Sequence, residues 1–221
     1  GNEIRTFMPR YGCINERRNQ LHEVIRLSGM NLIIDDNDHQ LIIKVASIPS
    51  ARIQIYFIDN DDYFSRKAIL TDDEGKEFAD NDERAIFFAR GVLETVRKLN
   101  WAPSVVHCMG WMSAIAPIYL KKVFNDDPIF RDVKVVVTLC DDRFEQNLSS
   151  EFDQKIASEG VKDENVAKSY YEALYLLNKR PFIDFNAIDD IEYLKEKYKN
   201  QKILSKSTKL ISSNIFNLDN Y

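Results

Sequence analysis

The feature that most constrains the fold is a pair of apolar runs separated by a turn and a helical segment. Residues 104–120 have the pattern of a short buried strand, a turn at Gly110 and an amphipathic helix, and a second apolar run follows at 133–139. Parallel neighbouring strands need a crossover of about a dozen residues, which this spacing provides. The pattern predicts a parallel βαβ unit. Because open α/β sheets bind ligands at the carboxyl ends of their strands, we expect any chemistry at 107–110 and 140–143.

The composition excludes several classes of protein. The chain has 221 residues, is 44% hydrophobic and 29% charged, and carries a net charge of −5. That is enough for one large core, or for a core with an appendage. A mildly acidic chain gives no reason to expect a nucleic-acid partner. No stretch reaches the ~20 apolar residues that span a bilayer, so we expect no membrane association. The three cysteines, Cys13, Cys108 and Cys140, are widely spaced, which favours a reducing cytoplasm over a disulfide framework.

The first residues admit two interpretations. The segment 1–9 has no initiator methionine and leads from a turn straight into a strand. One interpretation is that the sequence begins inside a domain whose earlier strand and helix are missing. The other is that a glycine from a tag precedes a genuine start.

Further elements follow from apolar periodicity and turn residues. A first strand is predicted at 4–8 and ends at Pro9. A capping box at residues 80–83 predicts a helix that ends at 98–100. Three short apolar runs separated by turn signals predict antiparallel hairpins at the sheet edge, at 21–34, 41–48 and 53–58. After residue 142 we expect helices and one short strand (181–185), with the helices at 151–158, 164–178 and 189–199.

Few side chains carry chemistry by pattern alone. His107 is either a hydrogen-bonding group for a substrate or a histidine satisfied at the core edge, and the second interpretation is favoured. Together with His107, Cys108 and Cys140 could hold a metal, but no second histidine or Cys-x-x-Cys supports this. Buried cysteine acting as a small hydrophobe is the better interpretation, and no metal is predicted. Asp80 and Asn81 either cap a helix or present a carboxylate to a ligand, and the cap is favoured.

Four segments, in one order and spacing, resemble the N-terminal catalytic domain of bacterial glycogen and plant starch synthases, glycosyltransferase family five. They lie between residues 3 and 138 and are found at 3–12, at 55–60 with Tyr63 and Phe64, at 78–88, and at 101–112 running into 116–120. The resemblance implies an α/β fold, the N-terminal half of a GT-B enzyme, with a Rossmann-like three-layer parallel sheet and an antiparallel hairpin edge. We expect this domain at 1–142, lacking its first strand. A helical C-terminal extension that packs on the same core is expected at 143–221.

The resemblance also implies a reaction and a site. Members of the family transfer glucose from ADP-glucose to the non-reducing end of an α-1,4-glucan, with retention and without a metal or another cofactor. The catalytic candidate by family match is Asp80. The implied substrate-binding residues are Asn60, Tyr63, Asn81, His107 and Trp111.

The sequence departs from the family pattern at several points. It contains no Lys-x-Gly-Gly-Leu motif, and Met112 replaces the family histidine that contacts the donor glucose. A thioether cannot donate the hydrogen bond that an imidazole gives to a sugar. Cys140 and Asp141 replace another polar pair, and 221 residues leave no room for the family's C-terminal Rossmann half.

Two hypotheses follow from these departures. In the first, the chain is a glucosyltransferase domain that is incomplete or inactive as an isolated chain. In the second, it is a noncatalytic module that binds glucan, nucleotide-sugar or a partner. A second polypeptide, or a second copy of this chain, would then cover the face that normally meets the missing lobe.

Overall fold

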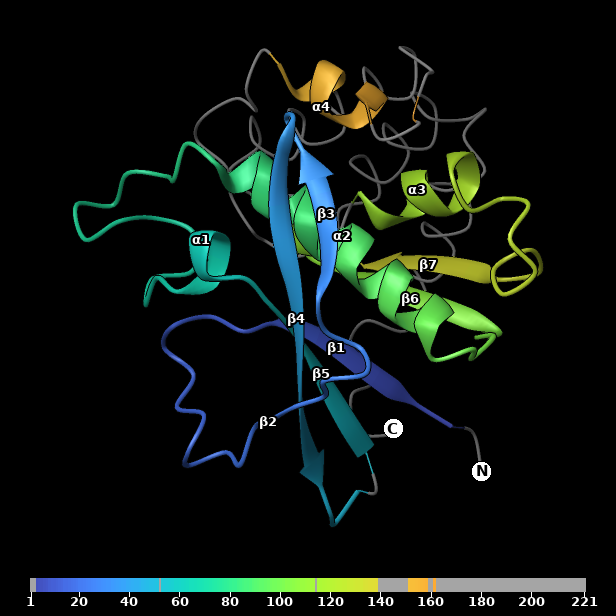
Figure 1. Cartoon of the computed structure of the whole chain (residues 1–221), viewed down its shortest axis with the longest axis horizontal. Helices are drawn as coiled ribbons and strands as arrows, with labels where there is room; N and C mark the ends of the chain where they lie inside the picture. The colour runs from blue at the N-terminus through green and yellow to red at the C-terminus, as the bar shows by residue number, and fades with distance from the viewer. Residues whose placement is uncertain (1–2, 52, 114, 139–150, 159–160, 162–221) are drawn as a thin grey trace, which may run out of the picture.

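Helix α2 (Asn81–Lys98) lies at the centre of the fold in the computed structural model, which describes residues 3–51, 53–113, 115–138, 151–158 and 161. On one side α2 contacts strands of a five-stranded sheet, and on the other it contacts a parallel βαβ unit (Figure 1). The helix predicted from the 80–83 signal is confirmed, with its end at Lys98.

The five-stranded sheet is mixed. Its strands run in the order β1, β5, β4, β2, and β3 also pairs with β4. β1 and β5 are parallel, and every other pair is antiparallel, which confirms the predicted hairpins. Asp35 and Asp36 form the two-residue turn between β3 and β4 with φ of 50° and 60°, as a tight hairpin turn requires. The strands are β1 (Arg5–Pro9), β2 (His22–Glu23), β3 (Met30–Ile34), β4 (Asn37–Ile48) and β5 (Ile53–Asp59).

The predicted βαβ unit is present. β6 (Val105–Met109) and β7 (Lys134–Thr138) pair in parallel. The expected single helix between them is divided into a 3₁₀ turn, η1 (Trp111–Ser113), and α3 (Ala116–Lys122), which carries a proline in its first turn. Among the described strands, β6 and β7 form a sheet of their own. The α/β class is therefore confirmed, but the described sheet is a mixed one plus a parallel pair rather than one parallel sheet.

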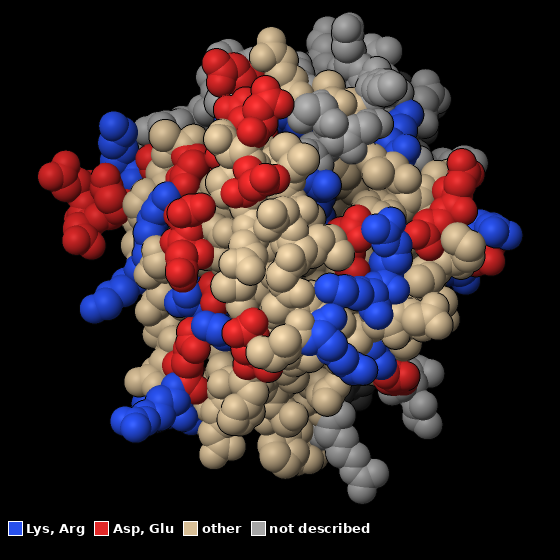
Figure 2. Space-filling view, in the orientation of Figure 1, with Lys and Arg blue, Asp and Glu red and all other residues tan. Residues whose placement is uncertain are grey.

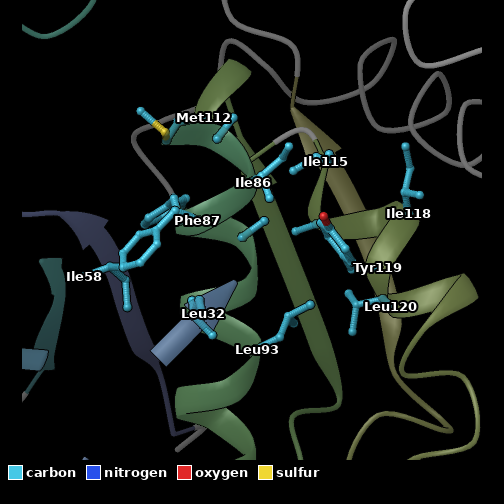
Figure 3. Close-up of a cluster of buried hydrophobic side chains, with 14 of the residues drawn as sticks. Leu32, Ile58, Ile86, Phe87, Leu93, Met112, Ile115, Ile118, Tyr119 and Leu120 are labelled. Atoms are coloured by element: carbon cyan, nitrogen blue, oxygen red, sulfur yellow. The ribbon is translucent and has the colours of Figure 1, made fainter. Parts of the chain in front are cut away.

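The core lies on both sides of α2. Figure 3 shows Ile58 of β5 on one side of Phe87 and Tyr119 of α3 on the other, all buried. The helix approaches the sheet closely at Gly91, where a Cβ would lie 3.0 Å from side-chain atoms of both Ile58 and Leu41. Burying each large side chain contributes about 1.5–3 kcal/mol, so the position of α2 is strongly fixed.

A short helix, α4 (Phe152–Ser158), packs on the same core and confirms the helix predicted at 151–158. Phe152, Ile156 and Val161 are buried with the core side chains. The elements predicted at 164–178, 181–185 and 189–199, and with them most of the 143–221 extension, lie outside the described residues. The boundary at 142 therefore stays a prediction.

The face of the molecule shown in Figure 2 carries both positive and negative side chains. Figure 2 shows acidic and basic side chains interspersed around a largely uncharged centre. Over the described part of the chain, no helix combines the length and the apolar character needed to cross a bilayer.

Candidate functional site

The candidate residues after strand β5 serve first as structural groups. Asn60 precedes α1 (Asp61–Phe64) and caps it, because its side-chain oxygen accepts from the backbone N–H groups of Asp62 and Tyr63 at 3.0 and 3.3 Å. Its amide nitrogen donates to the carbonyl of Gln40 at 3.0 Å. With Asn60 5% exposed, both ends of its amide are used inside the protein.

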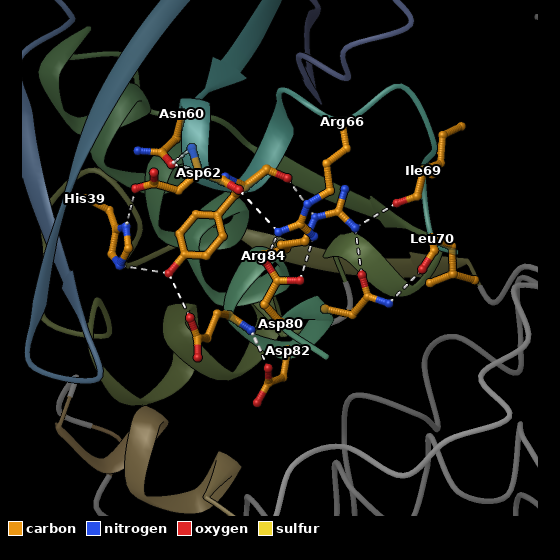
Figure 4. Close-up of polar contacts among 12 residues, drawn as sticks. His39, Asn60, Asp62, Arg66, Ile69, Leu70, Asp80, Asp82 and Arg84 are labelled. Atoms are coloured by element: carbon orange, nitrogen blue, oxygen red, sulfur yellow. Dashed lines mark hydrogen bonds and ion pairs between the residues drawn. The ribbon is translucent and has the colours of Figure 1, made fainter. Parts of the chain in front are cut away.

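Arg84 organises the loop that leads into α2. Its guanidinium is fully buried and donates to the carbonyls of Tyr63 and Ile69 at 2.9 and 2.8 Å. It also donates to the side-chain oxygen of Asn81 at 2.6 Å (Figure 4). The Asn81 amide nitrogen in turn donates to the Leu70 carbonyl at 3.0 Å. Burial lowers the pKa of Arg84, and its aromatic surroundings compensate in part: the guanidinium lies 5.3–5.9 Å from three ring centroids, those of Tyr11, Phe64 and Phe78.

Asp80, the catalytic candidate, is held by Arg66. Both guanidinium Nη atoms contact the carboxylate, Nη1 at 2.7 Å from Oδ1, while the guanidinium lies 4.5 Å from the centre of the Phe78 ring. The hydrogen bond to Asp80 raises the pKa of Arg66 despite burial. The capping box was therefore wrong in mechanism: α2 begins where predicted, but the Asp80 side chain makes no cap hydrogen bond because Arg66 engages it. With 26% of its side chain exposed, Asp80 remains accessible to solvent.

Tyr63 joins a second polar chain at the same end of α2. Its hydroxyl donates to Glu83 Oε2 at 3.0 Å and lies 2.9 Å from His39 Nε2. The other ring nitrogen of His39 lies 3.3 Å from Asp62 Oδ2. Burial, together with the charge of Glu83, raises the pKa of Tyr63, so the hydroxyl keeps its proton. The Tyr63 ring is buried, and its polar atom is already engaged within the protein.

A cation from far along the chain completes this cluster. Lys155 of α4 places its Nζ 2.6 Å from Glu83 Oε1 and 3.2 Å from Asp82 Oδ2. The Asp82 side chain is 2% exposed and that of Lys155 5%. Burial alone would lower the pKa of Lys155, but the hydrogen bonds and charges of Glu83 and Asp82 outweigh it and the pKa is raised.

The loop after β1 contacts this region at Gly12. Its N–H donates to the Arg66 carbonyl at 2.8 Å, and an added Cβ would lie 1.9 Å from the carbonyl oxygen of Ser65. Only glycine fits so close an approach. The same loop begins with Arg10, whose Nε lies 2.9 Å from the buried carboxylate of Asp59, and Lys44 Nζ lies 2.9 Å from the same carboxylate. The carboxyl ends of β1 and β5 thus hold paired charges.

The remaining candidates lie at the carboxyl end of β6, and η1 packs against α2. His107, in the middle of β6, is exposed, whereas the favoured interpretation placed it at the edge of the core, and Trp111 is half-buried. Met112 is 6% exposed and lies near Ile86 and Phe87 in the core (Figure 3). Cys108 is 3% exposed, and burial raises the pKa of its thiol to about 12, as expected of a cysteine that packs as a small hydrophobe.

The structure therefore brings together four of the six predicted site residues, Asn60, Tyr63, Asp80 and Asn81, around the amino end of α2. His107 and Trp111 belong to the neighbouring βαβ unit. Cys140 and Asp141 lie outside the described residues. In the described ranges, no group of three or more His, Cys, Asp or Glu side chains could hold a metal ion.

Sequence reasoning missed the residues that connect the site. Glu83 was assigned only to the capping box, and both Glu83 and Arg84 stood inside a segment that carried the resemblance, 78–88, so a signal for them existed. Arg66 lay outside the segments that carried the resemblance, and His39 lay within a hairpin strand; neither had a local signal. Lys155 is separated from Glu83 by 72 residues. Its role depends on tertiary packing that no local pattern reveals.

The fold of part of the chain matches that of a solved catalytic domain. Part of the chain superposes on the catalytic domain of Starch Synthase IV from Arabidopsis thaliana, solved bound to ADP and acarbose. The TM-score is 0.50 at 17% sequence identity, and the match covers 60% of this chain and 26% of that one. At this identity the likeness speaks for the fold.

Sequence comparison identifies the family. The chain is 42% identical over 140 residues to a glycogen synthase from Chlorobium limicola and 41% identical to one from Chlorobium luteolum. These matches cover 63% of this chain but only 29% of each relative, so the chain matches less than a third of their length. Residues 1–178 match the starch synthase catalytic domain model, and the chain belongs to that glycosyltransferase family. The resemblance drawn from the four segments is confirmed.

Proposed function

We propose that this chain forms part of a glucosyltransferase of the glycogen and starch synthase type, which transfers glucose from ADP-glucose to an α-1,4-glucan. One observation carries the proposal. Four residues that the family resemblance assigns to the site converge at the amino end of α2, where Arg66 and Arg84 hold two of them, Asp80 and Asn81. A helix amino end carries roughly half a positive charge, which suits a polar or anionic ligand.

In this proposal some of the site residues contact the sugar, and others hold the site in shape. Asp80 offers a carboxylate that is fixed in orientation by Arg66 and partly exposed, so it can accept hydrogen bonds from sugar hydroxyls. His107 presents an exposed imidazole, and the half-buried Trp111 offers an aromatic surface to a sugar ring. Asn60, Asn81 and Tyr63 act in this proposal by shaping the site, since their polar atoms are bonded within the protein. The reaction needs no metal or other cofactor in this proposal.

A second candidate function is a noncatalytic module that binds glucan, nucleotide-sugar or a partner polypeptide. Met112 favours it, because this side chain is buried in the core where the family pattern has a sugar-contacting histidine. Stabilising the departing diphosphate is usually the largest catalytic contribution. In the described part of the site, Arg10, Lys44 and Arg66 are each paired with carboxylates. The cationic groups that stabilise the diphosphate would therefore have to come from elsewhere.

A transfer assay separates the two functions. The full polypeptide that contains this chain is incubated with labelled ADP-glucose and maltodextrin. We expect label in the glucan, and we expect Asp80→Asn to lower the rate at least about tenfold while the exposed loop variant Asp73→Asn has no effect.

A binding measurement completes the test. If no label is incorporated but maltoheptaose raises the melting temperature, the noncatalytic function is the correct one. If neither ADP-glucose nor maltoheptaose binds, the glucosyltransferase and the glucan- or nucleotide-sugar-binding module are contradicted, and of the second candidate function only the binding of a partner polypeptide is left.

A further inference from the structure

The buried face of α4 carries a lysine where a short packing helix would ordinarily place an apolar residue. Phe152 and Ile156 lie three residues before and one residue after Lys155, and all three side chains are buried. Counted from Phe152 these are positions i, i+3 and i+4, which lie in one stripe along a helix. A buried ammonium is costly unless it is paired and hydrogen-bonded, so the pairing partners of Lys155 explain why it is there.

Those partners are the acidic residues in the first turn of α2. Asp82 and Glu83 follow Asp80 after Asn81, which places three carboxylates at the N-cap and in the first turn of α2. Arg66 neutralises Asp80, and the ion pairs of Lys155 reach the other two. The positive end of the helix dipole repels a cation at the helix amino end, so the attraction between Lys155 and these carboxylates must outweigh that repulsion.

Glu83 transmits this contact to the candidate site. One carboxylate oxygen of Glu83 lies 2.6 Å from Lys155 Nζ, and the other accepts the Tyr63 hydroxyl at 3.0 Å. A carboxylate held at both oxygens has a single orientation, and it therefore fixes the Tyr63 ring against His39. Tyr63 also gives its backbone carbonyl to Arg84, which binds Asn81.

We propose that Lys155 is a positioning residue: through Glu83 it fixes Tyr63, and through the Tyr63 carbonyl it fixes Arg84 and Asn81, the groups that shape the sugar site at the amino end of α2, so that α4 becomes part of the site. This rests on the proposed function. If Lys155 only filled space in the core, methionine could replace it without changing the site. A lysine that positions Glu83 would be replaceable by arginine, which can reach both carboxylates, and not by methionine.

The test compares Lys155→Met and Lys155→Arg with the exposed control Lys67→Met in the full protein. The probes are maltoheptaose and ADP-glucose, with the ¹³Cζ NMR signal of Tyr63 as an internal reporter. We expect Lys155→Met to shift the Tyr63 signal and to weaken ligand binding about tenfold, while the arginine variant and the control stay within about twofold of the parent. Methionine binding as tightly as the parent, or an unmoved Tyr63 signal, overturns the proposal.

A second variant covers the case in which Lys155→Met does not fold. Lys155→Met combined with Asp82→Asn removes the fully buried carboxylate along with its cation, so the charge that loses its ion pair is that of Glu83, whose side chain is 22% exposed. We expect this double variant to fold and still to show the displaced Tyr63 signal, because Glu83 has lost its ion pair. A folded double variant with a native Tyr63 signal contradicts the proposal. If the parent protein binds neither probe, the proposed function fails, and the Tyr63 signal alone then decides whether Lys155 positions Tyr63.

Discussion

The two ends of the candidate site differ in how their side chains are used. At the amino end of α2, Asn60, Asn81 and Tyr63 are buried, and their polar atoms bind other groups of the protein. At the carboxyl end of β6, Met112 is buried among apolar side chains and His107 faces outward. The polar residues that match the family pattern, Asn60, Asn81 and Tyr63, lie where backbone groups and charged side chains of the protein bond to them. Met112, which departs from the pattern, lies in an apolar core that a thioether side chain can fill.

The largest effect is expected at Arg84. Replacing it by methionine leaves the carbonyls of Tyr63 and Ile69 and the Asn81 side chain without their donor. We expect Arg84→Met to lower the free energy of unfolding by about 3–5 kcal/mol in urea denaturation. The control is Arg97→Met, on the same helix, with 49% of its side chain exposed, which should cost at most about 1 kcal/mol. Equal losses in the two variants would show that the polar end of α2 is not organised by Arg84.

Restoring the family histidine at position 112 tests the other end of the site. Because Met112 is buried in the core, Met112→His places an imidazole among apolar side chains. We expect a loss of about 2 kcal/mol in thermal or urea unfolding. The control is Met109→His on the exposed end of β6, where Met109 is 60% exposed and the change should be near zero. A neutral Met112→His would mean that this region can rearrange to admit a polar group.

The alkaline pH dependence of stability reports on Tyr63. Its raised pKa means that the folded protein keeps this proton at a pH where tyrosine in the unfolded chain, with a pKa near 10, is losing it. The Tyr63 contribution is therefore fully present below about pH 10 and is lost as the pH rises further. Lys155, whose pKa is also raised, contributes in the same direction. Between pH 9 and 11 we expect the free energy of unfolding of Tyr63→Phe to fall by about 1 kcal/mol less than that of the parent, as measured by urea unfolding at each pH. Identical pH profiles of the unfolding free energy in the two proteins would contradict the buried hydrogen bond of Tyr63.

The smallest stability effect is expected at Asp80. Its side chain and that of Arg66 are 26% and 32% exposed, so solvent screens their ion pair. Asp80→Asn should cost less than about 1 kcal/mol of unfolding free energy, although we expect it to lower glucosyl transfer strongly. A large loss of stability would place Asp80 among the supporting residues instead of the sugar-contacting ones.

Local patterns predicted much of the fold and less of the site. The hairpins, the βαβ unit and the length of α2 follow from apolar periodicity and turn residues, which act over a few positions. The division into a mixed sheet and a separate parallel pair depends on strand pairing across the chain, which periodicity does not encode. α1, with only four residues and an Asn60 cap, was too short for a periodic signal.

The site residues show the same limit more sharply. The capping-box signal placed Asp80 and Asn81 correctly at the start of a helix, and the family resemblance made them site candidates, but neither revealed the partners that determine their chemistry. Arg66 forms an ion pair with the Asp80 carboxylate, which makes no cap hydrogen bond, and Lys155 of α4 forms an ion pair with Glu83. Both depend on side chains that meet only after the chain has folded.

The central claim is that the amino end of α2 faces the sugar. It is tested most directly by titrating ¹⁵N-labelled protein with maltoheptaose and ADP-glucose and following the backbone amide signals. The account predicts saturable shifts at Asp80, Asn81 and His107. Saturable binding that moves none of these signals, with the shifts confined to the far end of α2, would contradict it.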